Sequence, residues 1–151
     1  MKHIWSILCQ KSSIDVETNL LSLFECVEEL SLVINQDKVS KTNKQIVPLQ
    51  FQIVSFWTIE DTKEDDILEV KISLLDPDKK LLSNFENKFN IKKGILRFRN
   101  RINIKGLPIT QEGRYIFKIS QRTKDEKEYK EIAELPLDIK ITYKLSNINK
   151  L

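Results

Sequence analysis

Residues 95–105 read Ile-Leu-Arg-Phe-Arg-Asn-Arg-Ile-Asn-Ile-Lys, and residues 113–120 read Gly-Arg-Tyr-Ile-Phe-Lys-Ile-Ser. Apolar and polar residues alternate in both segments, which is the period of a β-strand with one buried and one solvated face. The apolar set is Leu96, Phe98, Ile102, Ile104, Tyr115, Phe117 and Ile119. The link between the segments contains Gly106, Pro108 and Gly113, which are typical of a turn. We therefore expect residues 95–120 to form a β-hairpin with a basic outer face.

Strand alternation continues elsewhere in the chain, over residues 4–11, 49–59, 67–75 and 129–143. Residues 49–59 are apolar on much of both faces, which favours a central strand. Pro136 has no amide donor, so the last strand should lie at an edge or be bulged there. Residues 81–89 are irregular and fit a short edge strand. We expect turns at residues 15–19, 76–79 and 121–128, an acidic loop at 60–66 and a polar loop at 35–45.

Residues 20–34 are open to two interpretations. The helical interpretation rests on an apolar stripe with Thr18 or Asn19 as its cap, and the residue pattern alone leans toward it. The stripe consists of Leu20, Leu23, Phe24, Val27 and Leu30. The alternative is a strand that returns along residues 4–11.

In that alternative, pairing of Asp15 with Leu20 around a four-residue turn would place Cys9 opposite Cys26. Opposed Cβ atoms in antiparallel strands lie about 4.5–5.5 Å apart, which is near the range for a disulfide. Two small thiols in a reducing compartment are the simpler interpretation of this pair.

Length and segment spacing bound the fold class. A chain of 151 residues and 17.8 kDa is expected to form one domain with its own core. Seven or eight short strands separated by turns, with little helix, predict an all-β, antiparallel β-sandwich of the immunoglobulin-like or C2-like kind. We expect the domain to span residues 1–144 and residues 145–151 to be a C-terminal tail.

The composition excludes several classes of protein. No apolar run approaches the roughly 18 residues of a membrane helix. The apolar start that ends at Cys9 is too short for a lipoprotein signal, and Leu8 is a poor residue before a lipidated cysteine. Two cysteines make no disulfide framework. We expect a cytoplasmic protein.

Several short motifs occur in a defined order over most of the chain. They are Leu8-Cys9, Ile14-Asp15, Asn19-Leu20-Leu21-Ser22-Leu23-Phe24, Val54-Ser55-Phe56-Trp57, Leu75-Asp76-Pro77-Asp78, Ile104-Lys105-Gly106-Leu107-Pro108, Glu112-Gly113-Arg114-Tyr115 and Ile132-Ala133-Glu134-Leu135-Pro136-Leu137. With them the chain resembles a family of small uncharacterised bacterial β-sandwich proteins, a domain of unknown function. The resemblance implies that residues 20–30 form a strand. It implies no activity.

The residues that carry enzyme and cofactor chemistry are scarce. His3 is the only histidine, so a metal site of ordinary His/Cys spacing and a nucleophile–histidine pair both lack their parts. Gly94, Gly106 and Gly113 make no phosphate-binding loop. Carboxylates at residues 60–66 and at Asp76 and Asp78 could bind Ca²⁺ if the loops met, but solvated turns are the simpler interpretation. We expect no catalytic residues, no metal and no cofactor.

The strongest functional signal is the basic face, which comprises Arg97, Arg99, Arg101, Arg114, Lys118 and Arg122. Cross-strand acids such as Glu69, Glu134 or Asp138 could neutralise it. Otherwise it would receive an anionic partner, either an acidic protein or, second, a nucleic acid. Inward-pointing Phe98, Tyr115 and Phe117 would leave no aromatic side chains there for base stacking.

These observations favour a non-enzymatic interaction module with a protein partner. The first alternative is a sandwich that binds nucleic acid through the basic face. The second is an unrecognised enzyme, which would need a deep pocket with convergent polar groups. The oligomeric state does not follow from the sequence.

Overall fold

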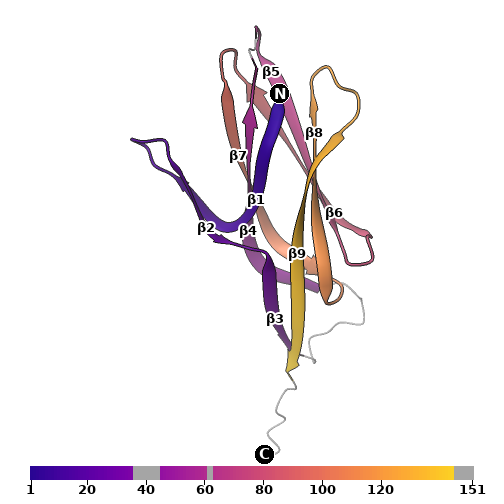
Figure 1. Ribbon diagram of the computed structural model, residues 1–151. Helices are drawn as coiled ribbons and strands as arrows, with labels where there is room; N and C mark the ends of the chain where they lie inside the picture. Colours follow the sequence, from indigo (N-terminus) through magenta and orange to yellow (C-terminus); the bar gives the residue numbers. More distant parts are fainter. Residues whose placement is uncertain (36–44, 61–62, 145–151) are drawn as a thin grey trace, which may run out of the picture.

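The computed structural model describes residues 1–35, 45–60 and 63–144, and these residues form nine β-strands and no helix (Figure 1). The strands are β1 (Lys2–Ile14), β2 (Leu21–Cys26), β3 (Glu29–Asn35), β4 (Gln45–Thr58), β5 (Asp66–Leu75), β6 (Leu81–Ile91), β7 (Arg97–Ile109), β8 (Gly113–Thr123) and β9 (Lys130–Lys144). The expected tail at 145–151 and most of the expected loop at 35–45 lie outside the described residues.

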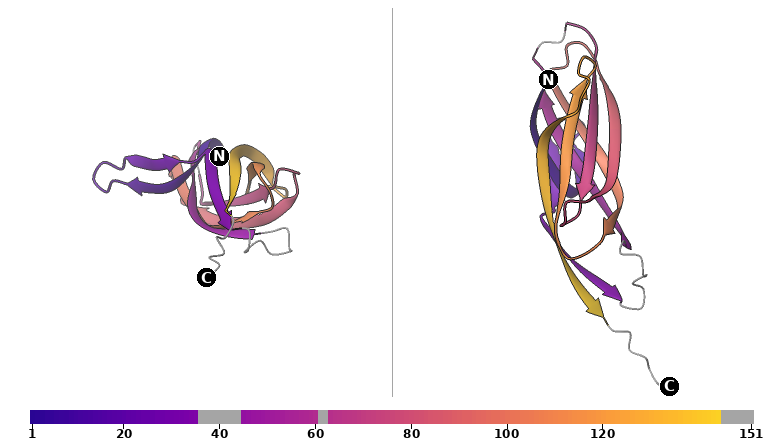
Figure 2. Two further views of the ribbon diagram at one scale, coloured as in Figure 1. Left: turned by 90° about the horizontal axis from the view of Figure 1, so that it is seen from below. Right: turned by 90° about the vertical axis from the view of Figure 1, so that its right-hand side faces the viewer.

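The strands form two sheets that pack face to face. Sheet A has the order β2-β1-β4-β7 and is antiparallel. Sheet B has the order β3-β9-β8-β5-β6 and is mixed, because β3 runs parallel to β9. Seen from below, the two sheets curl around a common interior (Figure 2). The all-β prediction is confirmed, with nine strands in place of the expected seven or eight. The prediction that the sandwich is antiparallel throughout is wrong, because β3 reaches β9 by a crossing from the other sheet and pairs parallel to it.

The N-terminal segments settle the ambiguity of residues 20–34 in favour of strands. The helical interpretation is wrong, because β2 pairs antiparallel with β1 and places Cys9 opposite Cys26. Both cysteines are free thiols. The single expected strand is divided at Val27 and Glu28, where the chain leaves sheet A and continues as β3 in sheet B.

The predicted hairpin at residues 95–120 is wrong. β7 is an edge strand of sheet A, whereas β8 lies inside sheet B between β9 and β5. The link between them therefore crosses from one sheet to the other. The alternation was read correctly, since Ile102, Ile104, Phe117 and their inward neighbours are buried. Two amphipathic strands bury the same face whether they pair in one sheet or stack in two, so alternation alone could not decide between these arrangements.

The core lies between the inner faces of the two sheets. Sheet A contributes Leu8, Phe51, Ile53, Trp57, Ile102 and Ile104, and sheet B contributes Leu68, Val70, Ile72, Leu74, Tyr115, Phe117, Ile119, Leu137 and Ile139. Burial of such side chains is worth roughly 1.5–3 kcal/mol each. The expected core residue Leu96 is not part of it and is exposed just before β7. Tyr143, near the end of β9, is exposed as well.

Trp57, near the end of β4, joins the two sheets across this core. Its side chain is fully buried, and its indole Nε1 donates a 2.7 Å hydrogen bond to Oε1 of Gln121 on β8. The ring of His3 packs edge-on against Trp57, with 5.4 Å between ring centroids. The buried indole N–H is thereby satisfied from the opposite sheet, so the tryptophan sets the relation of β4 to β8.

Tyr115 closes the crossing between β7 and β8. Its buried hydroxyl accepts hydrogen bonds from the backbone N–H groups of Thr110 (2.9 Å) and Gln111 (3.1 Å). The same hydroxyl donates to the carbonyl of Gln111 at 2.7 Å. One side chain therefore satisfies three backbone groups of the crossing, in the manner of a tyrosine corner.

Most of the remaining turn and edge predictions are confirmed. Two need correction: residues 81–89 lie in the regular strand β6 and not in a short irregular one, and residues 121–123 of the expected turn belong to β8. Asp76 accepts from the N–H of Lys80 through its carboxylate at 2.8 Å and forms the expected turn. Pro136 pairs with Ile116 of β8, while β3 pairs with β9 only from Asp138 onward. β9 is therefore a local edge at Pro136, although it is flanked by two strands farther along. β4 is central, and β6 is an edge strand.

We predict that Tyr115→Phe lowers the free energy of unfolding by about 1–3 kcal/mol, because the three hydrogen bonds between its hydroxyl and the backbone of Thr110 and Gln111 are lost. Urea denaturation followed by tryptophan fluorescence measures the change. Tyr143→Phe, at an exposed tyrosine, is the control and should stay within about 0.5 kcal/mol of the original protein. Equal effects of the two substitutions would contradict the role assigned to the hydroxyl.

A second prediction concerns pH. Burial lowers the pKa of His3 below its ordinary value, so the folded protein binds a proton less readily than the unfolded chain. The stability of the folded protein is therefore highest above the ordinary histidine pKa of about 6.5, where His3 is neutral in both the folded and the unfolded chain. Part of this stability is lost as the pH falls through the pKa of His3 in the folded protein. Unfolding free energies at a series of pH values between about 8 and 5 should therefore decline in the original protein. His3→Phe should remove most of this decline, since the chain has no other histidine.

Candidate functional site

The six residues of the predicted basic face lie on two separate faces. Arg97, Arg99 and Arg101 project from β7 on the outer face of sheet A, and Arg114, Lys118 and Arg122 project from β8 on the outer face of sheet B. The separation follows from the crossing between β7 and β8. The single face expected from the sequence does not exist, and the two groups have different surroundings.

On sheet B, each basic side chain is paired with acids on the neighbouring strands. Arg114 makes a two-pronged contact with Asp138, at 2.7 and 2.8 Å. Lys118 lies 3.0 Å from Glu131 and 3.1 Å from Glu134. Arg122 pairs with Glu69. The expected neutralisation by Glu69, Glu134 and Asp138 is therefore found, and it applies to this half of the set alone.

The pKa directions on sheet B agree with these pairs. The hydrogen bond from Arg114 lowers the pKa of Asp138, and that from Arg122 lowers the pKa of Glu69. Hydrogen bonds to Glu131 and Glu134 raise the pKa of Lys118. All these side chains are exposed or half-exposed to solvent, where such pairs add little to stability. Their main effect is that Arg114, Lys118 and Arg122 each have an acidic partner on the outer face of sheet B.

The outer face of sheet A has a different composition. The register places Trp5, Phe56 and Arg99 side by side on β1, β4 and β7, and places Ile7, Val54 and Arg101 in the next row. The rings of Trp5 and Phe56 are in contact, with 5.8 Å between centroids. Aromatic and apolar side chains therefore lie directly beside the arginines. We call this surface, with Arg97, the arginine–aromatic face.

No acid lies on the three strands that carry this face. The residues of β1, β4 and β7 include Lys2, Lys11, Arg97, Arg99, Arg101 and Lys105 but no aspartate or glutamate. In sheet B, by contrast, acids and bases are interspersed along β5, β6 and β9. Uncompensated like charges on one face create a positive potential that attracts anions.

The hairpin of residues 10–26, which we call the hairpin arm, leaves the sheet beyond Cys9 and projects from the body of the protein (Figure 1). Three contacts tie it to the arginine–aromatic face. Arg101 Nη1 donates to the carbonyl of Ser12 at 3.3 Å, and Ser12 Oγ donates to Gln52 Oε1 at 2.7 Å. Arg99 Nη2 reaches both the carbonyl and the Oδ1 of Asn19 at 3.2 Å. The acceptors are neutral, so these contacts give the two arginines no ion pair.

The turn of the arm is built as its sequence predicts. Asp15 Oδ1 accepts from the N–H of Thr18 at 2.7 Å and from the N–H of Glu17 at 3.1 Å, and the first of these hydrogen bonds is the main cause of its lowered pKa. Asn19 takes a positive φ of 56°, which asparagine tolerates well. Asn19 is thereby placed where Arg99 can reach it.

Trp5 and Phe56 are the site residues that the sequence reasoning missed. The prediction that no aromatic side chain lies on the basic face was based on residues 95–120. Within that segment it holds, because Phe98, Tyr115 and Phe117 point inward. Trp5 and Phe56 come from β1 and β4, which lie beside β7 only in the folded sheet. The absence of acids from residues 2–14, 45–58 and 97–109 was readable from the sequence and was the available signal.

The two acidic clusters do not meet. One precedes β5 and the other follows it, so a ten-residue strand of about 33 Å separates them. In the first cluster, Lys92 and the N–H of Lys93 contact the carboxylate of Asp65, and Lys124 contacts Glu64. Asp61 lies outside the described residues. Among the described residues, no group of three or more His, Cys, Asp or Glu side chains is arranged to hold a metal ion.

Comparisons with known proteins give no family for this chain. No protein-family model matches it, and no curated protein matches it either. The resemblance to a bacterial β-sandwich family therefore stays a prediction from short motifs. In the described part of the chain there is also no helix long and apolar enough to cross a membrane.

We predict that replacing Arg99 and Arg101 together by methionine releases the hairpin arm without unfolding the body. Amide exchange in β2 and proteolytic cleavage within residues 15–19 should both become faster, while the free energy of global unfolding should change by less than about 1 kcal/mol. Arg97→Met is the matched control, since the described residues show no contact of Arg97 with the arm. Unchanged exchange in the double variant would mean that other contacts hold the arm.

Proposed function

We propose that this protein is a non-enzymatic interaction module that binds an anionic partner through the arginine–aromatic face of sheet A. The observation that carries the proposal is the separation of charge between the sheets. Strands β1, β4 and β7 carry six basic residues and no acid, whereas the bases of sheet B that were predicted to share the site are paired with acids.

The chemistry of the face favours an acidic protein segment as the partner. Arginine forms two-pronged hydrogen bonds with carboxylates, and its planar group packs against aromatic rings. Trp5, Ile7 and Phe56 are half-buried and offer apolar contact between β1 and β7. Buried aromatic anchors beside arginines are the usual source of affinity at protein interfaces. A segment with acidic and apolar residues would complement both parts of the face.

Single-stranded nucleic acid is the second candidate, and the Trp5–Phe56 pair favours it. Aromatic side chains on a positively charged sheet provide stacking surfaces for bases, and arginines contact phosphates. The two rings pack against each other, with 38° between their planes, so they offer one stacking position where single-stranded binders commonly offer several. For this reason we rank single-stranded nucleic acid second to an acidic protein segment as the partner.

The finer fold class is part of the same proposal. We infer an immunoglobulin-like sandwich over a C2-like one, and the Tyr115 corner at the crossing between sheets supports this assignment. A cytoplasmic location fits a chain whose two neighbouring cysteines are free thiols.

The proposal predicts different effects for two triple variants that each remove three positive charges. The first is Arg97→Ala, Arg99→Ala and Arg101→Ala, and the second is Arg114→Ala, Lys118→Ala and Arg122→Ala. Fluorescence anisotropy with a labelled peptide of alternating Glu and Phe measures binding. The first variant should lose at least about tenfold in affinity, and the second should lose much less. Replacement of the three β7 arginines by lysine should restore part of the binding, because charge is kept while the paired hydrogen bonds are lost.

A labelled single-stranded oligothymidine serves as the second probe. Three results together would favour the nucleic-acid candidate. The oligonucleotide would bind more tightly than the acidic peptide, its binding would weaken steeply with salt, and the β7 variant would not bind it. Equal loss in both triple variants would contradict the assignment to sheet A, since net charge alone would then explain binding. Failure of both probes to bind the original protein would contradict the proposal as a whole.

A further inference from the structure

Part of strand β1 has a neighbour on only one side. β4 pairs with β1 from Lys2 to Cys9, and β2 pairs with β1 on the other side only from Cys9 to Ile14. The chain leaves sheet A after Cys26, so no described strand continues the row of β2 along residues 2–8. This half of β1 is an open sheet edge inside the body of the molecule.

The backbone groups of this edge can be assigned from one hydrogen bond. Val27 N–H donates to the carbonyl of Leu8 at 2.9 Å, so the polar groups of Leu8 point away from β4. In an antiparallel pair the direction alternates with each residue, and Ser6 therefore presents its N–H and C=O on the same open side. An added strand could accept from and donate to these groups.

The edge that faces it, on β9, is closed to such pairing. Asp138 N–H donates to the carbonyl of Glu28, so Asp138 points toward β3, and Pro136 points to the same side two residues earlier. Proline has no N–H to offer, and placement of proline or charge on an edge is a common protection against strand addition. Glu134, the next residue on that side, adds a charge. Of the two facing edges, β1 is the receptive one.

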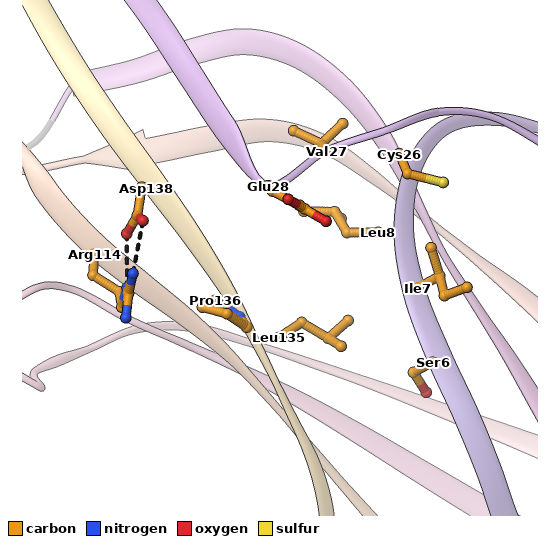
Figure 3. A pocket seen from close by; sticks show the side chains of 10 residues that line it. All are labelled: Ser6, Ile7, Leu8, Cys26, Val27, Glu28, Arg114, Leu135, Pro136 and Asp138. Atoms are coloured by element: carbon orange, nitrogen blue, oxygen red, sulfur yellow. Dashed lines mark hydrogen bonds and ion pairs between the residues drawn. The ribbon is translucent and has the colours of Figure 1, made fainter.

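A pocket of about 360 Å³ lies between the two edges (Figure 3). Its apolar lining comes from Ile7 and Leu8 of β1, Val27 of the crossing, and Leu135 and Pro136 of β9. Glu28 and the Arg114–Asp138 ion pair are the charged part of the lining. The pocket therefore combines apolar surface with unpaired backbone groups of a strand.

We propose that a short extended segment of a partner protein adds to β1 at this edge, antiparallel to it and in the row that β2 leaves at Cys26. The segment pairs with Ser6 and places apolar side chains at alternate positions in the pocket. This mode of recognition takes its affinity from main-chain hydrogen bonds and its selectivity from side-chain pockets. The site shares only Ile7 with the arginine–aromatic face and does not depend on the function proposed for that face.

Peptide chemistry fits the pocket better than the other ligand classes. Small organic ligands do not satisfy the repeat of strand N–H and C=O groups, whereas an extended peptide does. Glu28 and Asp138 contribute carboxylates, which disfavour nucleic acid at this position. β2 already pairs with β1 on this side, farther along the strand, so the added segment would continue the pairing that β2 begins.

The experiment selects short random peptides displayed on phage against the full chain and synthesises the enriched sequences. Selected peptides should show apolar residues at alternate positions. Their binding should slow exchange of the Ser6 amide proton, measured by NMR, because that N–H group becomes hydrogen-bonded. Leu135→Lys, on the β9 side of the pocket, should weaken binding at least about tenfold through a charge in the apolar lining. Ile46→Lys, at an exposed apolar residue elsewhere on sheet A, is the matched control and should bind as the original protein does.

Three outcomes would overturn the proposal. The first is a selection that enriches no peptide. The second is binding that leaves the exchange of the Ser6 amide unchanged. The third is protection of this amide that grows with protein concentration in the absence of peptide, which would assign the edge to a second copy of the chain. Circular dichroism confirms that each variant is folded, and Leu135→Ala provides a smaller change at the same position if the lysine variant does not fold.

Discussion

The structure depends on the burial of one apolar face of each sheet against the other, and Trp57 is a fully buried residue that links the two sheets. Its indole is fully buried and hydrogen-bonded to Gln121 of the opposite sheet. A buried N–H without a partner is costly, so the bond favours one relative position of β4 and β8. Tyr115 acts in the same way at the crossing between β7 and β8. The outer faces of both sheets are positioned by these inner contacts.

The two outer faces then differ in kind. Sheet B places acids opposite bases on neighbouring strands, which is the ordinary arrangement of a solvated face. Sheet A places arginines beside aromatic and apolar side chains and includes no acid on three of its strands. Arg99 and Arg101 also hold the hairpin arm through neutral acceptors. Their contact with the arm links its position to the surface proposed to bind an anionic partner.

The open edge of β1 arises from the same feature that builds sheet B. The chain crosses at Val27 and Glu28 so that β3 can pair with β9, and the crossing leaves the row beside residues 2–8 without a strand. β9 is protected at the corresponding position by Pro136 and Glu134, while β1 has neither proline nor acid there. The difference between the two edges is the reason that strand addition is assigned to β1.

The sequence by itself determined the strands, the turns and the inward and outward sides of most of them, because alternation and turn chemistry are local properties. It identified the Asp15 turn, the central position of residues 49–59 and the acids that neutralise Arg114, Lys118 and Arg122. Alternation could not show that β7 and β8 belong to different sheets, since a strand buries the same face when it pairs and when it stacks. Only the tertiary structure could therefore divide the basic residues between two faces. It also decided that Trp5 and Phe56, which are distant in sequence from β7, lie beside its arginines, because hydrogen-bonding between strands brings residues together regardless of their separation along the chain.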